Sequence, residues 1–129
     1  MKATPIRPSV LVVDDESVIT NTLAAILEQH GYAATRAYSG EHAVQMARQS
    51  APDFLVCDVV MGEMDGIETA QQVQAACPDC RVVLITGAPA TAELLARAEA
   101  NGERFDMLLK PFHPSLLIET LKKVEHKPN

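Results

Sequence analysis

The sequence has no long apolar run, and its N-terminus has no apolar core. A membrane-spanning helix needs about 20 consecutive apolar residues, and no stretch of the chain approaches that length. The first residues, MKATPIRPS, do not resemble a secretory signal. We therefore expect a cytoplasmic protein that does not bind membranes.

Basic residues and cysteines are also few. The 17 Asp and Glu residues outnumber the 11 Lys and Arg residues, which are dispersed, and the formal net charge is −6. Binding to nucleic-acid phosphates needs clustered positive charge, so we expect a protein partner and no direct contact with nucleic acid. Cys57, Cys77 and Cys80 are too few for a disulfide framework. The CPDC segment has the spacing of a redox motif, but it ends a helical pattern, so we interpret all three cysteines as free thiols.

Two kinds of apolar pattern alternate along the chain. Short continuous apolar runs, typical of strands buried on both faces, cover residues 9–13, 54–57, 81–86 and 106–109, with a weaker, edge-like run at 33–38. Helical faces follow these runs, formed by Ile19, Leu23, Ile26 and Leu27; by Val44 and Ala47; by Ile67, Ala70, Val73 and Cys77; by Leu94, Leu95 and Ala98; and by Leu117, Leu121 and Val124. This order predicts an α/β fold with a parallel sheet, in a single domain over residues 1–129 with its core at about residues 9–125.

Polar side chains stand where the predicted strands end. Asp14 and Asp15 follow the first strand, Asp58 the third, and Lys110 the fifth, while Thr86 ends the fourth. In parallel α/β sheets the ligand site lies at the carboxyl ends of the strands. Three carboxylates and one lysine leave a net negative charge that a divalent cation would balance, and oxygen ligands suit Mg²⁺.

A carboxylate beside Mg²⁺, a hydroxyl and an ammonium group can support phosphoryl transfer to Asp, because positioning and charge neutralisation do most of that catalysis. Asp58 is the best candidate for the nucleophile, since Asp14 and Asp15 are placed as a pair to hold the ion. The product would be an acyl phosphate.

Four segments at these strand ends, VVDDES, CDVVMGEMDG, LITGA and LLKPF, resemble in order and spacing the signature segments of response-regulator receiver domains of two-component signalling. The resemblance covers nearly the whole chain. It implies a flavodoxin-like, doubly wound sheet with strand order 2-1-3-4-5 and five helices. After the fifth predicted helix only EHKPN remains, so we expect no output domain in this chain.

The resemblance also implies roles for single residues. Asp58 would be the phosphoacceptor, and it would hold Mg²⁺ together with Asp14, Asp15 and the main-chain carbonyl of Val60. Such a protein catalyses only its own phosphorylation and dephosphorylation and is not an enzyme that acts on a separate substrate.

By the same resemblance, Thr86 would close onto the phosphoryl group, and Lys110, joined to Pro111 by a cis bond, would pair with it. The donor would be a histidine kinase or a His-containing phosphotransfer protein. The signal would pass to a downstream protein partner or to a fused output domain absent from this chain, from a monomer or a weak homodimer.

The chain departs from the family pattern at three places. Gly62 stands where proline is usual, Gly87 where alanine is frequent, and Met107 where an aromatic ring is common. We expect a less constrained loop after Asp58 and weaker coupling through Met107. Val60 and Ala88 cannot orient an attacking water, which predicts slow self-hydrolysis.

Other classes fit less well. A haloacid-dehalogenase-like phosphatase needs a second Asp at the position of Val60, and a dinucleotide-binding protein needs a glycine-rich turn where DDES stands. The four histidines are scattered over an α/β pattern, unlike the single exposed His of a phosphotransfer bundle. The remaining alternative is a degenerate receiver that binds a protein partner without being phosphorylated.

Overall fold

The computed structural model describes residues 7–87, 96 and 105–125 of the chain. In these residues a parallel sheet of five strands has the order β2-β1-β3-β4-β5, which confirms the predicted fold class and strand order. The strands are β1 (Ser9–Val13), β2 (Ala33–Ala37), β3 (Phe54–Asp58), β4 (Arg81–Thr86) and β5 (Asp106–Leu109). As expected, the weak run at 33–38 is an edge strand.

Four helices accompany the sheet in the described residues, namely α1 (Ser17–Gln29), α2 (Gly40–Gln49), α3 (Gly66–Ala76) and α5 (Pro114–Glu125). The helix expected around Leu94, Leu95 and Ala98 falls outside the described residues, apart from Ala96. None of the helices within this part of the chain has the length and hydropathy of a membrane-spanning segment.

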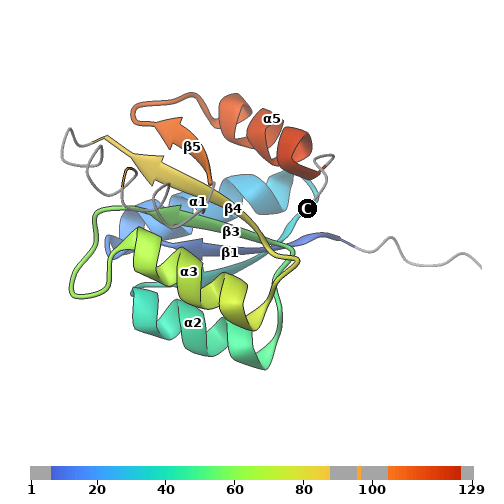
Figure 1. Ribbon diagram of the computed structural model, residues 1–129. Coiled ribbons are helices and arrows are strands. Elements are labelled where there is room, and N and C mark those ends of the chain that lie inside the picture. The colour runs from blue at the N-terminus through green and yellow to red at the C-terminus, as the bar shows by residue number, and fades with distance from the viewer. Residues whose placement is uncertain (1–6, 88–95, 97–104, 126–129) are drawn as a thin grey trace, which may run out of the picture.

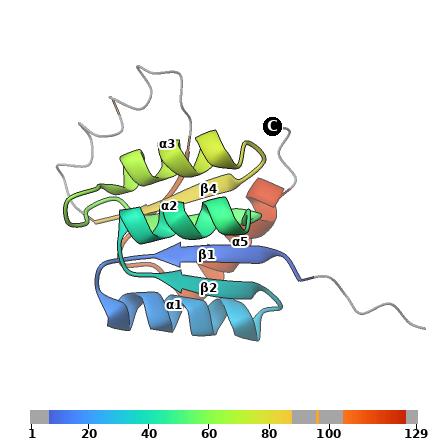
Figure 2. The ribbon, with the colours of Figure 1, turned by 90° about the horizontal axis from the view of Figure 1, so that it is seen from below.

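The helices form two layers, one on each face of the sheet (Figure 1). Alternate strand residues point to opposite faces, so the core consists of two apolar clusters. Leu11, Leu55 and Leu84 pack with α2 and α3, which lie over the sheet in Figure 2. Val12 and Val56 pack with α1 and α5 on the other face. The central strands β1, β3 and β4 are thus buried on both sides, as their continuous apolar runs predict.

The buried face of α1 contains the predicted Leu27 and two residues that the apolar pattern did not name. Thr20, Ala24 and Leu27 are fully buried, and Leu23 is half-buried and packs against the same core. Ile19 and Ile26 are half-buried as well. The pattern counted large apolar side chains, so it left out Ala24 and the polar Thr20.

Glycine is required where the loop after β3 enters α3. The Gly66 amide donates a hydrogen bond of 2.8 Å to the Val59 carbonyl. A Cβ atom at Gly66 would lie 2.2 Å from the main-chain oxygen of Asp58, and main chain cannot rotate away. By contrast, a Cβ atom at Gly62, in the same loop, would meet nothing within 4 Å.

These two glycines predict opposite effects of the same substitution. Gly66→Ala should lower the free energy of unfolding by about 1–3 kcal/mol, because the added methyl group forces the loop away from β3. Gly62→Ala should leave it unchanged or raise it by up to about 1 kcal/mol, because alanine restricts the unfolded chain. Urea denaturation of both variants would measure this. Equal destabilisation by the two substitutions would contradict the close approach at Gly66.

Candidate phosphoacceptor and metal site

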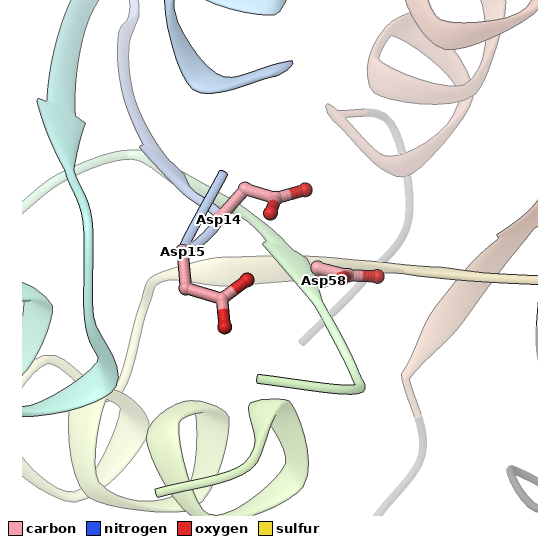
Figure 3. Close-up of side chains that lie close together, drawn as sticks. All are labelled: Asp14, Asp15 and Asp58. Atoms are coloured by element: carbon pink, nitrogen blue, oxygen red, sulfur yellow. The ribbon is translucent and has the colours of Figure 1, made fainter. Parts of the chain in front are cut away.

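The pairing of β1 with β3 brings two carboxylates together at the carboxyl edge of the sheet. Val13 is in register with Cys57, so the next residues of the two strands, Asp14 and Asp58, are neighbours. Asp14 is 2% exposed and Asp58 8% exposed, while Asp15 is exposed. One carboxylate oxygen from each of the three residues lies within 4.8 Å of the others. Figure 3 shows the three side chains close together.

The turn from β1 into α1 is held by hydrogen bonds to Asp14. The Asp14 carboxylate accepts a bond of 2.9 Å from the Glu16 amide, and its main-chain carbonyl accepts one of 2.8 Å from the Thr20 hydroxyl. Its amide donates to the Ala37 carbonyl of β2 at 3.4 Å. The sequence analysis missed Thr20. The sequence feature that could have indicated Thr20 is a hydroxyl residue among the apolar positions of α1, six residues after Asp14.

Lys110 brings positive charge to the carboxylates from the end of β5. Its Nζ atom lies 3.3 Å from Asp58 Oδ1 and 3.9 Å from Asp14 Oδ2. The Lys110 amide donates to the carbonyl of Thr86, which is buried at the end of β4. A Cβ atom at Gly87 would lie 3.2 Å from the Lys110 Cβ atom, so this glycine leaves space for the lysine stem. The peptide bond that follows Lys110 is cis.

The lysine does not fully offset the negative charge. The pKa of Asp14 is raised to about 6, chiefly by burial; the charges of Asp58 and Asp15 contribute to the rise, and the Glu16 amide and Lys110 oppose it. Burial likewise raises the pKa of Asp58, although Lys110 acts against it. Further positive charge at this place would therefore stabilise the ionised carboxylates.

The residues present fit a hard divalent cation. Three carboxylates converge, which is the donor type that Mg²⁺ and Ca²⁺ prefer, and the exposed side of Asp15 leaves access for water ligands. Sulfur and imidazole ligands are absent from this cluster, which disfavours a site of the structural zinc type.

A family model described as the response regulator receiver domain matches residues 10–122. The chain belongs to this family. It is 35% identical over 114 residues to the transcriptional regulatory protein ZraR of Salmonella typhimurium, which covers 88% of this chain and 25% of ZraR. It is 30% identical over 116 residues to the chemotaxis protein CheY of Thermotoga maritima, which covers 89% of this chain and 95% of CheY.

A solved receiver domain confirms the fold. The CheY-like response regulator receiver domain protein of Methanospirillum hungatei superposes with a TM-score of 0.84 at 23% identity, over 93% of this chain and 95% of that one. The matched region thus spans a quarter of the length of ZraR but nearly all of CheY. The chain is a receiver domain of the two-component type.

In this receiver domain the predicted residues lie at one edge of the sheet, although not all are equally close. Asp14, Asp15, Asp58 and Lys110 form the cluster, and Thr86 is joined to it through the main chain of Lys110. The Val60 side chain is 50% exposed after β3. Ala88 lies outside the described residues. Met107 is half-buried and packs against the apolar core under α2 and α3.

Cysteine chemistry is not part of this site. The three cysteines are unpaired, as predicted, and all three are buried. Cys77 and Cys80 lie at the two ends of a turn in which the Cys80 amide donates to the Cys77 carbonyl. Burial raises the pKa of the Cys80 thiol to about 12, which leaves it without nucleophilic character at neutral pH.

The raised pKa of Asp14 predicts how stability depends on pH in the presence of a chelator. The native carboxyl titrates near pH 6 and the unfolded one near its ordinary value of 3.8, so the native state holds more protons between these values. The free energy of unfolding should therefore rise as the pH falls from about 7 to about 4.5. The full difference between the two pKa values is worth on the order of 3 kcal/mol.

Asp14→Asn is the control for this pH dependence, because the amide keeps an acceptor oxygen for Glu16 but does not titrate. The variant should be more stable than the wild type at pH 7 and should respond less to pH; Asp58 supplies the remaining response. Urea denaturation at several pH values measures both effects. A pH response as large in Asp14→Asn as in the wild type would contradict the assignment.

Proposed function

We propose that this receiver takes a phosphoryl group onto Asp58 from a histidine kinase or a His-containing phosphotransfer protein and passes the signal to a protein partner through a conformational change. The observation that carries the proposal is the convergence of the buried Asp58 with Asp14, Asp15 and Lys110. A chain that only bound a partner would have no use for a partly uncompensated acidic cluster, which costs stability.

The proposed metal is Mg²⁺, held by Asp14, Asp15, Asp58 and the main-chain carbonyl of Val60. When bound, it supplies positive charge to the carboxylates and to the oxygens of the transferred phosphoryl group. The chain itself supplies the nucleophile and a fixed ammonium group. Both are oriented by strands of one sheet.

The chemistry at Asp58 is a displacement at phosphorus. A carboxylate oxygen of Asp58 forms the new P–O bond, and the P–N bond of the donor phosphohistidine breaks, so the electron pair returns to the imidazole. Lys110, whose Nζ is 3.3 Å from Asp58 Oδ1, is placed to pair with the incoming phosphoryl oxygens. Thr86, at the end of the neighbouring strand, is proposed to close onto the same group.

The lifetime of the acyl phosphate should be long. Val60 has no group that could orient or deprotonate a water, and neither has Ala88. Met107 is flexible and adapts to gaps of several shapes, so we propose that it couples Thr86 only weakly to the partner surface. The receiver thus turns over no separate substrate; it catalyses its own phosphorylation and dephosphorylation.

The rest of the proposal follows from membership of the family. We propose a single receiver domain over residues 1–129, monomeric or weakly dimeric, located in the cytoplasm. Its downstream partner is a protein or a fused output domain, and it contacts neither nucleic acid nor membrane directly. A degenerate receiver that binds without phosphorylation is the alternative.

Acetyl phosphate provides a direct test of Asp58. With Mg²⁺ present, we expect the wild-type protein to gain the mass of one phosphoryl group, because charge neutralisation and positioning suffice without a donor protein. Asp58→Asn should gain nothing, and excess chelator should prevent labelling of the wild type. Intact-protein mass spectrometry reads all three samples.

Asp53→Asn is a matched control, because it makes the same change at the residue that precedes β3, the strand that ends at Asp58. Asp53 is exposed, precedes β3, and accepts a bond of 2.8 Å from the Ser9 amide, which an asparagine oxygen can also accept. This variant should be labelled like the wild type. Labelling of Asp58→Asn, or equal labelling in chelator, would refute the assignment of Asp58. A wild-type protein that is never labelled would favour the degenerate receiver.

A further inference from the structure

Thr20 is a fully buried hydroxyl residue in the first turn of α1. Its Oγ1 atom donates a hydrogen bond of 2.8 Å to the main-chain carbonyl of Asp14, six residues earlier. The Glu16 carbonyl, four residues earlier and the usual partner of a helical threonine, is 3.4 Å away. The shorter bond therefore leads out of the helix and into the turn that carries the carboxylates.

Thr69 shows what an ordinary threonine does in the same setting. It is also fully buried, near the start of α3, and its hydroxyl donates a bond of 2.8 Å to the carbonyl of Asp65, four residues earlier. That bond lies within the N-terminal turn of its own helix. The two threonines thus match in burial and bond length but differ in what they hold.

The bond from Thr20 fixes the orientation of a peptide group. The Asp14 carbonyl belongs to the peptide that joins Asp14 to Asp15, so its direction determines how the chain turns between the two acids. The next turn places the Glu16 amide 2.9 Å from the Asp14 carboxylate. The buried hydroxyl of Thr20 therefore fixes the start of the turn. The hydrogen bond from the Glu16 amide then orients the Asp14 side chain.

We propose that Thr20 is a positioning residue of the site: it holds the Asp14–Asp15 peptide so that both carboxylates stay directed at the space shared with Asp58. The effect on metal binding rests on the proposed function, whereas the effect on the geometry of Asp14 does not. Residues that orient metal ligands commonly change metal affinity by about 10–100-fold when they are removed.

The test compares three variants by NMR. Thr20→Val keeps the branched shape and removes the hydroxyl, Thr20→Ser keeps the hydroxyl, and Thr69→Val removes the matched bond in α3. In metal-free protein, we expect Thr20→Val to speed hydrogen exchange of the Glu16 amide several-fold, because its carboxylate acceptor is no longer aimed. Thr20→Ser and Thr69→Val should leave that exchange near the wild-type rate.

Titration with Mg²⁺ then measures affinity from amide shifts in the same samples. Thr20→Val should weaken binding about tenfold, at the low end of the usual range because Asp58, which stands on β3, keeps its place. Thr20→Ser should bind within about twofold of the wild type. Thr69→Val should bind like the wild type even where its melting temperature falls, which separates positioning from loss of stability.

The outcomes distinguish the positioning role of Thr20 from the proposed function of the site. Wild-type exchange at Glu16 together with wild-type Mg²⁺ affinity in Thr20→Val would overturn the positioning role. Equal weakening by Thr69→Val would also overturn it, because the effect would then follow stability. A wild-type protein that binds no Mg²⁺ would overturn the proposed function, and the exchange of the Glu16 amide would still decide the role of Thr20.

Discussion

The parallel register of β1 and β3 sets the conditions for the whole site. It places Asp14 beside Asp58 at the ends of two central strands, where apolar clusters on both faces exclude water from the strands. Two carboxylates held at such a place repel each other, and burial makes their ionisation costly. The rest of the site, namely Lys110, the turn into α1 and the loop into α3, serves to hold this unfavourable arrangement in place.

The stability needed for this arrangement comes from elsewhere in the fold. The central strands β1, β3 and β4 are buried on both faces, and closely packed small residues such as Ala24 and Gly66 belong to the helices that cover them. The carboxylates therefore cannot separate without breaking sheet pairing or helix packing. A charge cluster that could relax would lose the high local negative charge that makes it attractive to a cation.

Much of the fold could be predicted from the sequence, because strands buried on both faces give continuous apolar runs and the signature segments fix their order. The clustering of Asp14, Asp15, Asp58 and Lys110 followed from the position of these residues at strand ends. Thr20 could not be predicted in this way. Its role depends on a hydrogen bond to main chain across the end of a strand, and apolar periodicity carries no information about main-chain acceptors.

A related limit explains why Ala24 was missed on the buried face of α1, since small residues contribute little to an apolar pattern. The proposed roles in phosphorylation rest on the proximity of Asp14, Asp15, Asp58 and Lys110. The helix expected between β4 and β5 from Leu94, Leu95 and Ala98 lies outside the described residues.

The separation of the core into two clusters has a consequence for how this domain can change. The sheet lies between the side chains of the α2 and α3 face and those of the α1 and α5 face, so substitutions on opposite faces share few neighbours and their effects on stability should add. One face can then diverge, or be redesigned to recognise a new partner, while the packing of the other face is preserved. The loops at the carboxyl edge of the sheet connect to helices on both faces. Substitutions on either face therefore have to remain compatible with the site at this edge.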